Sequence, residues 1–303
     1  MVRVDERTNP VEGRVVWSPI KSLWFTTHAL IALVAGYATF SWEAGLTACV
    51  ATIVTLCCGQ SLGLHRLLIH RSFACPRWLE YLFVHLGTVV GMNGPFGMMA
   101  MHEIRDWSQR HPRCHAFFIH RASWWRDCYR QLHCEIHLDH PPCFVIEPEI
   151  AGDGLYRFLQ RTWMSQQLPW AILFYLLGGW AFVVWGISVR ITVSLLGHWL
   201  VGYLAHNHGQ REWELAGHAV QGYNVPYFGL WSMGEAWHNN HHAFPGSARF
   251  GLHENQHDPG WWMLCALKRI GLIWDVKLPE DLPERTELRH LGGDTIISEN
   301  AAA

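Results

Sequence analysis

Three histidines stand close together in the segment WHNNHHAFPGSARFGL, between Trp237 and Leu252. They are His238, His241 and His242, at positions i, i+3 and i+4. On a helix this spacing places all three imidazoles on one face, within reach of one small volume. Imidazoles gathered in this way bind iron, zinc, copper or nickel. The segment therefore predicts a metal site, with a solvated histidine-rich turn as the less favoured alternative.

Two further histidines, His65 and His70, occur in the segment GLHRLLIHRSF. Their spacing of five residues is slightly off one face of an α-helix, so the pair is expected to flank a site rather than stack along it. A pair of interfacial histidines is the alternative. His206 begins the segment HNHGQR, and His198 lies eight residues before it on nearly the same helical face. A histidine inside a membrane helix is often functional, but a structural role is the favoured interpretation of His198.

The segment HEIRDWSQRHPRCH supplies a third histidine group. His111 and His115 are four residues apart, which places them on one face of a helix, with Pro112 tolerated in a first turn. A solvated basic face is the alternative interpretation. The polar residues that follow His102 could hold the imidazole tautomers by hydrogen bonds; they are Glu103, Arg105 and Asp106.

The composition indicates a membrane protein and gives no sign of nucleic-acid binding. Half of the 303 residues are apolar, only 16% are charged, and the formal net charge is −2, so no basic surface for nucleic acid is expected. The 18 tryptophans, 14 phenylalanines and 8 tyrosines suit a bilayer interface. The nine cysteines include no CxxC pair, which excludes a rubredoxin or zinc-ribbon module.

Four apolar runs have about the length of membrane spans. Residues 23–40 and 44–64 form one hairpin, whose turn carries no Lys or Arg, whereas both outer ends are basic. Because basic flanks stay in the cytoplasm, these ends are predicted to be cytoplasmic. Residues 168–187 and 191–205 form a second hairpin, with Arg190 near its bend.

These runs predict an all-α integral membrane protein, with four transmembrane helices in two hairpins and a cytoplasmic helical cap that carries the histidine clusters. Residues 79–101 are apolar but broken by glycine and proline, which favours a partly embedded or interfacial helix. No repeat or long linker divides the chain. One domain over residues 1–303 is therefore expected, with flexible tails at 1–21 and 280–303.

The C-terminal segments GEAWHNNHHAFPGSARFGL, DPGWW and GLIWDVKLP, within residues 234–279, resemble the integral-membrane fatty acid desaturases. The likeness is to the bacterial and animal acyl-CoA desaturase-like branch. HRLLIHRSF resembles the first histidine box of that family, and AHNHGQR resembles its further histidine after the fourth span. On this resemblance His65, His70 and His206 correspond to family metal ligands.

The middle box departs from the family pattern W-x-x-x-H-x-x-H-H. From Trp107 the chain reads WSQRHPRCH, so His111 and His115 occupy two of the three positions and Cys114 takes the third. Either the Cys114 thiolate is itself a ligand, or another histidine fills the vacancy. A thiolate beside an O₂-activating centre would be easily oxidised, so a histidine is favoured, His102 before His120.

The resemblance implies a site of two iron ions held mostly by imidazoles, which uses O₂ to introduce a double bond into an acyl chain linked to CoA or to a lipid. No catalytic residue beyond the metal ligands is expected. A related di-iron membrane hydroxylase or ketolase is the alternative, as is a non-catalytic membrane metal-binding protein. The expected ligands are His65, His70, His111, His115, His206, His238, His241 and His242, with His102, Cys114 and His120 as further candidates.

The expected partners are a fatty acyl substrate, membrane lipid and an external electron donor. The sequence shows neither a cytochrome b5 module nor an iron–sulfur cysteine pattern, so ferredoxin, cytochrome b5 or a similar protein with its reductase is expected to deliver electrons. The active site is expected on the cytoplasmic side of a multi-pass protein.

Overall fold

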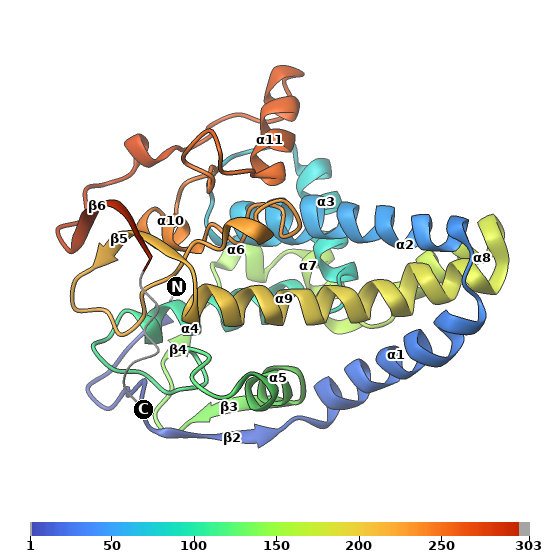
Figure 1. The fold of residues 1–303 in the computed structure, drawn as a ribbon, viewed down its shortest axis with the longest axis horizontal. Helices are drawn as coiled ribbons and strands as arrows, with labels where there is room; N and C mark the ends of the chain where they lie inside the picture. The colour runs from blue at the N-terminus through green and yellow to red at the C-terminus, as the bar shows by residue number, and fades with distance from the viewer. Residues whose placement is uncertain (1, 297–303) are drawn as a thin grey trace.

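Two helical hairpins form the longest part of the fold in the computed structural model, which describes residues 2–296 (Figure 1). In the first hairpin, α1 (Pro19–Ala38) is followed after a short turn by α2 (Trp42–Val54). α2 continues without a break into the π-helix η1 (Thr55–Ile69). Together α2 and η1 make one apolar helix of 28 residues.

The second hairpin consists of α8 (Gln167–Val183), η2 (Val184–Val189) and α9 (Arg190–Asn207). The backbone leaves the helical conformation at Gly178 and Gly179. The φ of 68° at Gly179 is one that glycine adopts readily and other residues do not. The chain turns back at these two glycines, and α9 then runs back beside the first hairpin (Figure 1).

Arg190, which the sequence pattern places near a bend, lies inside this helix and is only 1% exposed. Its guanidinium donates hydrogen bonds to the carbonyls of Val89 (2.8 Å) and Gly186 (2.8 Å) and to the amide oxygen of Gln167 (2.6 Å). Val89 is the last residue of α3 (Arg77–Val89), and the last carbonyls of a helix have no partner within it. Arg190 therefore donates a hydrogen bond to a carbonyl at the buried end of α3. The local sequence does not distinguish an arginine in this role from an arginine at a bend between two spans.

The apolar stretch at residues 79–101 contributes to two helices, α3 and α4 (Pro95–Gln109), with a turn at Gly91, whose φ is 91°. α3 packs very closely against η1. A Cβ added at Gly59 would lie 2.4 Å from the backbone of α3, and one at Gly63 would lie 2.5 Å from it. These glycines let the two helices approach at the level from which the histidines of η1 emerge.

Three small antiparallel sheets join distant parts of the chain. The pairs are β1 (Val2–Arg3) with β4 (Cys143–Phe144), β2 (Gly13–Trp17) with β3 (Cys134–Leu138), and β5 (Gln210–Leu215) with β6 (Leu288–Ile296). The prediction of an all-α chain did not include these strands, some of which lie within the ends at 1–21 and 280–303 that were expected to be flexible. Each terminal strand pairs with a segment far along the chain, so no local pattern reveals it.

The remaining helices are short and pack around the hairpins, and α10 and the strands gather at the end opposite the hairpin tips (Figure 1). They are α5 (Trp124–His133), α6 (Pro148–Ala151), α7 (Gly154–Thr162), η3 (Pro226–Phe228), α10 (His238–Ala243), α11 (Pro259–Arg269) and η4 (Pro279–Asp281).

The fold is mostly helical, as predicted. Within the described residues, two helices are long and apolar enough to cross a membrane, Trp42–Ile69 and Gln167–Asn207. The four spans, the cytoplasmic cap and the single domain stay predictions.

Candidate metal centre

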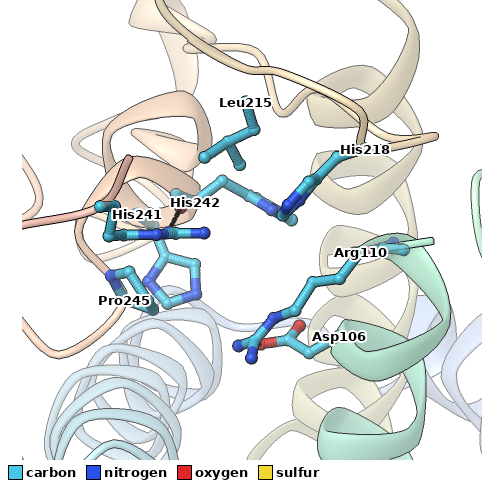
Figure 2. Close-up of a pocket in the computed structure, with 9 residues that line it drawn as sticks. Asp106, Arg110, Leu215, His218, His241, His242 and Pro245 are labelled. Carbon is cyan, nitrogen blue, oxygen red and sulfur yellow. Dashed lines mark hydrogen bonds and ion pairs between the residues drawn. The ribbon is translucent and has the colours of Figure 1, made fainter. Parts of the chain in front are cut away.

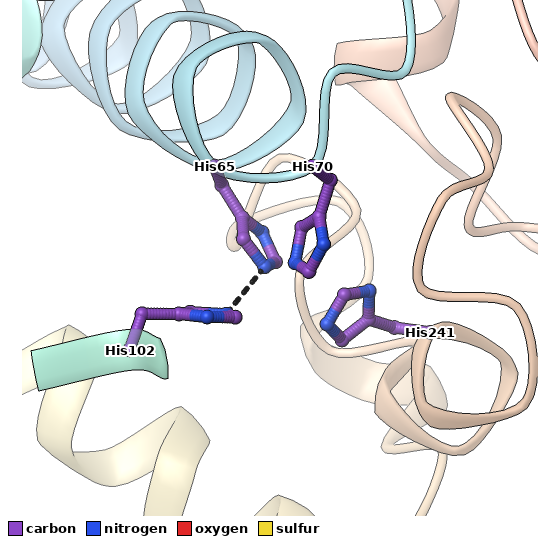
Figure 3. Close-up of side chains that lie close together, drawn as sticks. All are labelled: His65, His70, His102 and His241. Atoms are coloured by element: carbon purple, nitrogen blue, oxygen red, sulfur yellow. Dashed lines mark hydrogen bonds between the residues drawn. The ribbon is translucent and has the colours of Figure 1, made fainter. Parts of the chain in front are cut away.

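Four histidines from separate segments meet in what we call the first histidine group (Figure 3). His65 and His70 come from η1 and its last turn, His102 from α4 and His241 from α10. One possible ligand atom from each residue lies within 4.8 Å of the others. A single metal ion would therefore be within reach of four imidazoles.

The π-helix explains how His65 and His70 reach the same site. In a π-helix the backbone bonds join residues five apart, and here the N–H of His70 donates to the carbonyl of His65 at 3.0 Å. Residues five apart then lie on one face, and the two ring centroids are 4.8 Å apart. The pair predicted to flank a site therefore points into it together.

A carboxylate fixes the orientation of the His65 ring. The Nδ1 of His65 lies 2.5 Å from Oε2 of Glu235, whose other oxygen accepts a hydrogen bond from Ser61 at 2.6 Å. Although burial opposes it, the contact with His65 holds the pKa of Glu235 below its usual value. The proton of His65 is thus expected on Nδ1, which leaves the Nε2 lone pair free to bind a metal.

The second histidine group consists of His206 at the end of α9 and of His238 and His242 on α10. The Nε2 atom of His238 lies 3.3 Å from that of His206 and 3.0 Å from that of His242. The i, i+4 spacing on α10 predicts this shared face, whereas the contact with α9 depends on the packing of distant segments.

The arrangement of ring nitrogens fits metal ions. A neutral imidazole carries only one N–H, so three converging Nε2 atoms cannot all be satisfied by hydrogen bonds to one another. Burial lowers the pKa of His238 to about 3 and that of His102 to about 4, which keeps both rings neutral, the form that binds metal. Several buried nitrogens also have no hydrogen-bond partner among the described residues: His70 Nε2, His102 Nδ1, His206 Nδ1 and His241 Nδ1.

Two buried asparagines hold α10 in place between its histidines. The side-chain oxygen of Asn239 accepts hydrogen bonds from the backbone N–H groups of Glu212 and Trp213, both at 2.9 Å. The Asn240 amide donates to the carbonyl of Phe250 at 2.8 Å. Neither asparagine has a role that its position in the sequence predicts on its own, although the unbroken polar run between apolar neighbours marks the segment that contains them.

Comparison with known proteins decides the family. No family model matches the chain. A sn-1 stearoyl-lipid 9-desaturase from Anabaena variabilis is 36% identical over 243 residues, which cover 80% of this chain and 86% of the relative. An acyl-CoA 5-desaturase from Anemone leveillei is 32% identical, with 82% and 76% covered. A palmitoyl-monogalactosyldiacylglycerol delta-7 desaturase from Arabidopsis thaliana is 34% identical, with 83% and 67% covered.

The chain belongs to the fatty acid desaturase family. The resemblance drawn from the histidine motifs is thereby confirmed, and the protein is a fatty acyl desaturase and thus an oxidoreductase. Within residues 2–296, the two histidine groups are the clusters found that could hold a metal.

His120, one candidate for the vacancy in the middle box, lies beside the second group but uses both ring nitrogens elsewhere. Its Nδ1 lies 2.8 Å from Oδ2 of Asp127, and its Nε2 lies 2.8 Å from Nη1 of Arg105, which can only donate. The ring is therefore neutral, protonated on Nδ1, and has no lone pair left for a metal. Asp127 also accepts from the indole N–H of Trp199 at 2.9 Å.

His111, His115 and Cys114 belong to neither group. α4 ends at Gln109, so these residues follow the helix and share no face with its histidine. The ring of His111 instead lies 2.8 Å from the carbonyl of Trp107. Burial raises the pKa of Cys114 to about 11, which keeps it a thiol. Of the candidates for the middle box, only His102 enters a histidine group.

A cavity of about 20 Å³, the size of one water molecule, adjoins both groups (Figure 2). Its lining includes Asp106, Arg110, His241 and His242. One carboxylate oxygen of Asp106 lies 3.8 Å from Nδ1 of His102 and 3.8 Å from Arg110. Although burial opposes it, His102, His242 and Arg110 hold the pKa of Asp106 below its usual value. Asp106 is thus an anion close to His102, but 3.8 Å is too long for a hydrogen bond, so the hydrogen-bonding role expected of Asp106 from the sequence stays a prediction.

Proposed function

We propose that the desaturase holds two iron ions, one in each histidine group, and uses them with O₂ to introduce a double bond into an acyl chain. The convergence of seven imidazoles in two neighbouring groups carries this proposal. Imidazole suits iron, copper, nickel and zinc, but zinc has no redox chemistry, and an oxidoreductase of this kind needs a redox metal. When bound, the iron would supply the oxidising power that removes two hydrogen atoms from the acyl chain. In the same reaction O₂ takes up these two hydrogen atoms, two further electrons and two protons, and becomes two water molecules.

The protein's own part is to hold the imidazoles at fixed positions and to keep them neutral. α10 is central to this task because it supplies His241 to the first group and both His238 and His242 to the second. The ring centroids of His241 and His242 are 5.8 Å apart. Glu235 holds the orientation of the His65 ring from outside the first group, where such a partner raises the basicity of the ligand.

The proposed ligands are the seven histidines of the two groups: His65, His70, His102, His206, His238, His241 and His242. We expect His111, His115, His120 and Cys114 not to bind the metal, because the contacts and positions described above leave them no suitable atom near either group. No catalytic side chain beyond the ligands is needed for the proposed chemistry.

We further infer that both hairpins cross the membrane, which gives four spans with the histidine groups on the cytoplasmic side. Aromatic residues at the hairpin tips are exposed, such as Tyr37, Trp42 and Trp180, and exposed apolar residues follow along the arms, such as Leu30 and Ile172. Aromatic rings favour the bilayer interface and aliphatic side chains its interior. Reporter fusions at Ser41 and at the C-terminus should give opposite readings, and identical readings would contradict this topology.

The reaction needs two electrons per turnover from a reductant. We expect a separate carrier, such as ferredoxin or cytochrome b5 with its reductase, to dock on the cytoplasmic side. Reconstitution with each carrier tests which one supports turnover.

Lipid analysis of cells that express the protein tests the proposed activity. Cells with the wild-type chain should accumulate a monounsaturated acyl product under air, and cells with His241→Ala should not. His253→Ala is the matched control, because His253 is an exposed histidine that pairs with Glu212 away from both groups. Equal product from His241→Ala and wild type would refute the proposed role of the histidine groups.

A further inference from the structure

His198 is exposed although it lies on the inner face of α9. On that helix Ile191, Ser194 and Ala205 are buried and lie on the same side as His198, whereas Val193, on the opposite side, is 52% exposed. A side chain that points inward and is still exposed must border an opening within the helix bundle. The interpretation of His198 as a packed structural residue does not fit this position.

The groups around His198 place this opening beside the metal centre. The ionisable groups close enough to influence its ring are Arg105, Glu235, His120 and His65. Glu235 and His65 belong to the surroundings of the first histidine group, and Arg105 and His120 to those of the second. The opening therefore lies within reach of both groups.

Gly202 extends the free space toward His206. It lies one turn after His198 on the same face. A Cβ added at Gly202 would meet only the His120 ring, at 3.4 Å. The inner face of α9 thus offers a path from His206 past Gly202 to the imidazole of His198. At 1.5 Å per residue, His198 lies about 12 Å from His206 along the helix axis.

Two polar groups on this path have no partner. The hydroxyl of Ser194, one turn before His198, is buried and makes no hydrogen bond within the described residues. No described residue donates to, or accepts from, the His198 ring either. A buried polar group without a partner is costly, so the Ser194 hydroxyl needs a ligand that can form hydrogen bonds, and the exposed His198 ring, one turn away, is free to bind the same ligand. A saturated hydrocarbon chain cannot supply one.

We propose that His198 and Ser194 form a hydrogen-bonding subsite of the acyl channel, and that this desaturase accepts acyl chains that carry a hydroxyl or keto oxygen beyond the reacting carbons. This inference rests on the proposed function, because it assumes that the acyl chain lies against the histidine groups. An imidazole can donate or accept according to its tautomer, and a serine hydroxyl can do both. The pair therefore suits an alcohol as well as a ketone. A site built for such an oxygen rejects the chain that lacks it.

The test compares stearoyl chains with hydroxystearoyl chains in which the hydroxyl is moved carbon by carbon. The iron-loaded enzyme in membranes receives equal amounts of both, and mass spectrometry gives the ratio of desaturated products. The wild type should favour at least one hydroxystearoyl isomer by about tenfold or more in kcat/KM. His198→Leu should abolish that preference and keep turnover of stearoyl chains and the iron content, and Ser194→Ala should weaken it. His137→Leu, an exposed histidine on β3, is the matched control.

Equal rates for all chains in the wild type would mean that the subsite holds only water, and the proposal would be rejected. An unchanged preference in His198→Leu would also overturn it. Failure of the proposed function looks different, because no acyl product would form from any chain in any variant. Thermal shifts of the purified protein with stearate and hydroxystearate need no turnover and still decide the question. A larger shift for hydroxystearate in the wild type, lost in His198→Leu, supports the subsite, and equal shifts reject it.

Discussion

The ring of His120 lies flat against that of His206, with centroids 5.4 Å apart and an angle of 16° between the planes. His120 cannot move freely, because Asp127 and Arg105 each hold one of its ring nitrogens at 2.8 Å. Its φ of 54° is uncommon for a residue other than glycine. His120 is thus a fixed surface that sets the orientation of His206, and it acts on the second histidine group without touching a metal.

The first prediction concerns this stacked pair. His120→Ala should remove the surface and weaken metal binding in the second group by about 10–100-fold, the usual cost of losing an outer partner of a metal ligand. His120→Phe keeps a flat ring and should lose less. The metal affinities of the three proteins, measured by competition with a chelator, check this. Equal affinities in His120→Ala and wild type would show that the stacking has no positioning role.

The middle histidine box provides the second prediction. His102→Ala should lower the metal content because His102 is one of four imidazoles in the first group. Cys114→Ala should leave it unchanged, because Cys114 lies outside both groups and burial raises its pKa to about 11. Metal analysis of the two purified variants distinguishes the residues. Loss of metal in Cys114→Ala with retention in His102→Ala would establish the thiolate as a ligand.

Arg190 gives a prediction about stability. Arg190→Leu should lower the free energy of unfolding by about 1–3 kcal/mol, because the buried amide oxygen of Gln167 loses its donor and the carbonyl of Val89 keeps only the Gln167 amide as a donor. Thermal unfolding in detergent measures the change. Arg14→Leu, at an exposed position on β2, is the matched control and should have little effect. A normal transition in Arg190→Leu would mean that the amide oxygen of Gln167 does not need the arginine as its donor.

The buried histidines make the metal-free protein sensitive to acid. The pKa of His102 is lowered to about 4 and that of His238 to about 3, from 6.5, because burial disfavours the charged ring. Below about pH 6.5 the unfolded chain therefore binds protons that the folded chain refuses. The free energy of unfolding is therefore highest above about pH 6.5. It falls as the pH drops toward about 4, by about 1.4 kcal/mol per pH unit for each such histidine. Denaturant titrations should show this slope, and His102→Gln should reduce it. A flat profile would contradict the assigned burial.

The sequence predicted the parts of the site that depend on one helix. The i, i+3, i+4 spacing of α10 is a local property, so its shared histidine face could be read directly. His65 and His70 were placed off one face because the π winding of η1 leaves no local signal that spacing alone can supply. His102 was the favoured substitute for the missing histidine of the middle box, but only as a further candidate, since its position beside η1 depends on the packing of α4.

Other features depend on contacts between distant segments and escaped prediction for that reason. Glu235 reaches His65 from a separate loop, and the strand β2 pairs with β3 far along the chain. His111 and His115 have the spacing of residues on one face of a helix, but α4 ends before them. Because neither residue is helical, the spacing does not bring their side chains to one face. The apolar runs revealed the hairpins, whereas the bend at Gly178 and Gly179 was misplaced because an arginine between apolar residues resembles a turn.

The iron content of the purified protein tests the central claim most directly. After expression in iron-replete medium, the wild type should contain about two iron ions per chain, and His241→Ala and His206→Ala should each contain about one, because each removes a ligand from a different histidine group. The exposed control His253→Ala should contain as much iron as the wild type. Iron that is equal in all four proteins, or a stoichiometric amount of zinc with no iron-dependent activity, would contradict two metal sites built from the seven histidines.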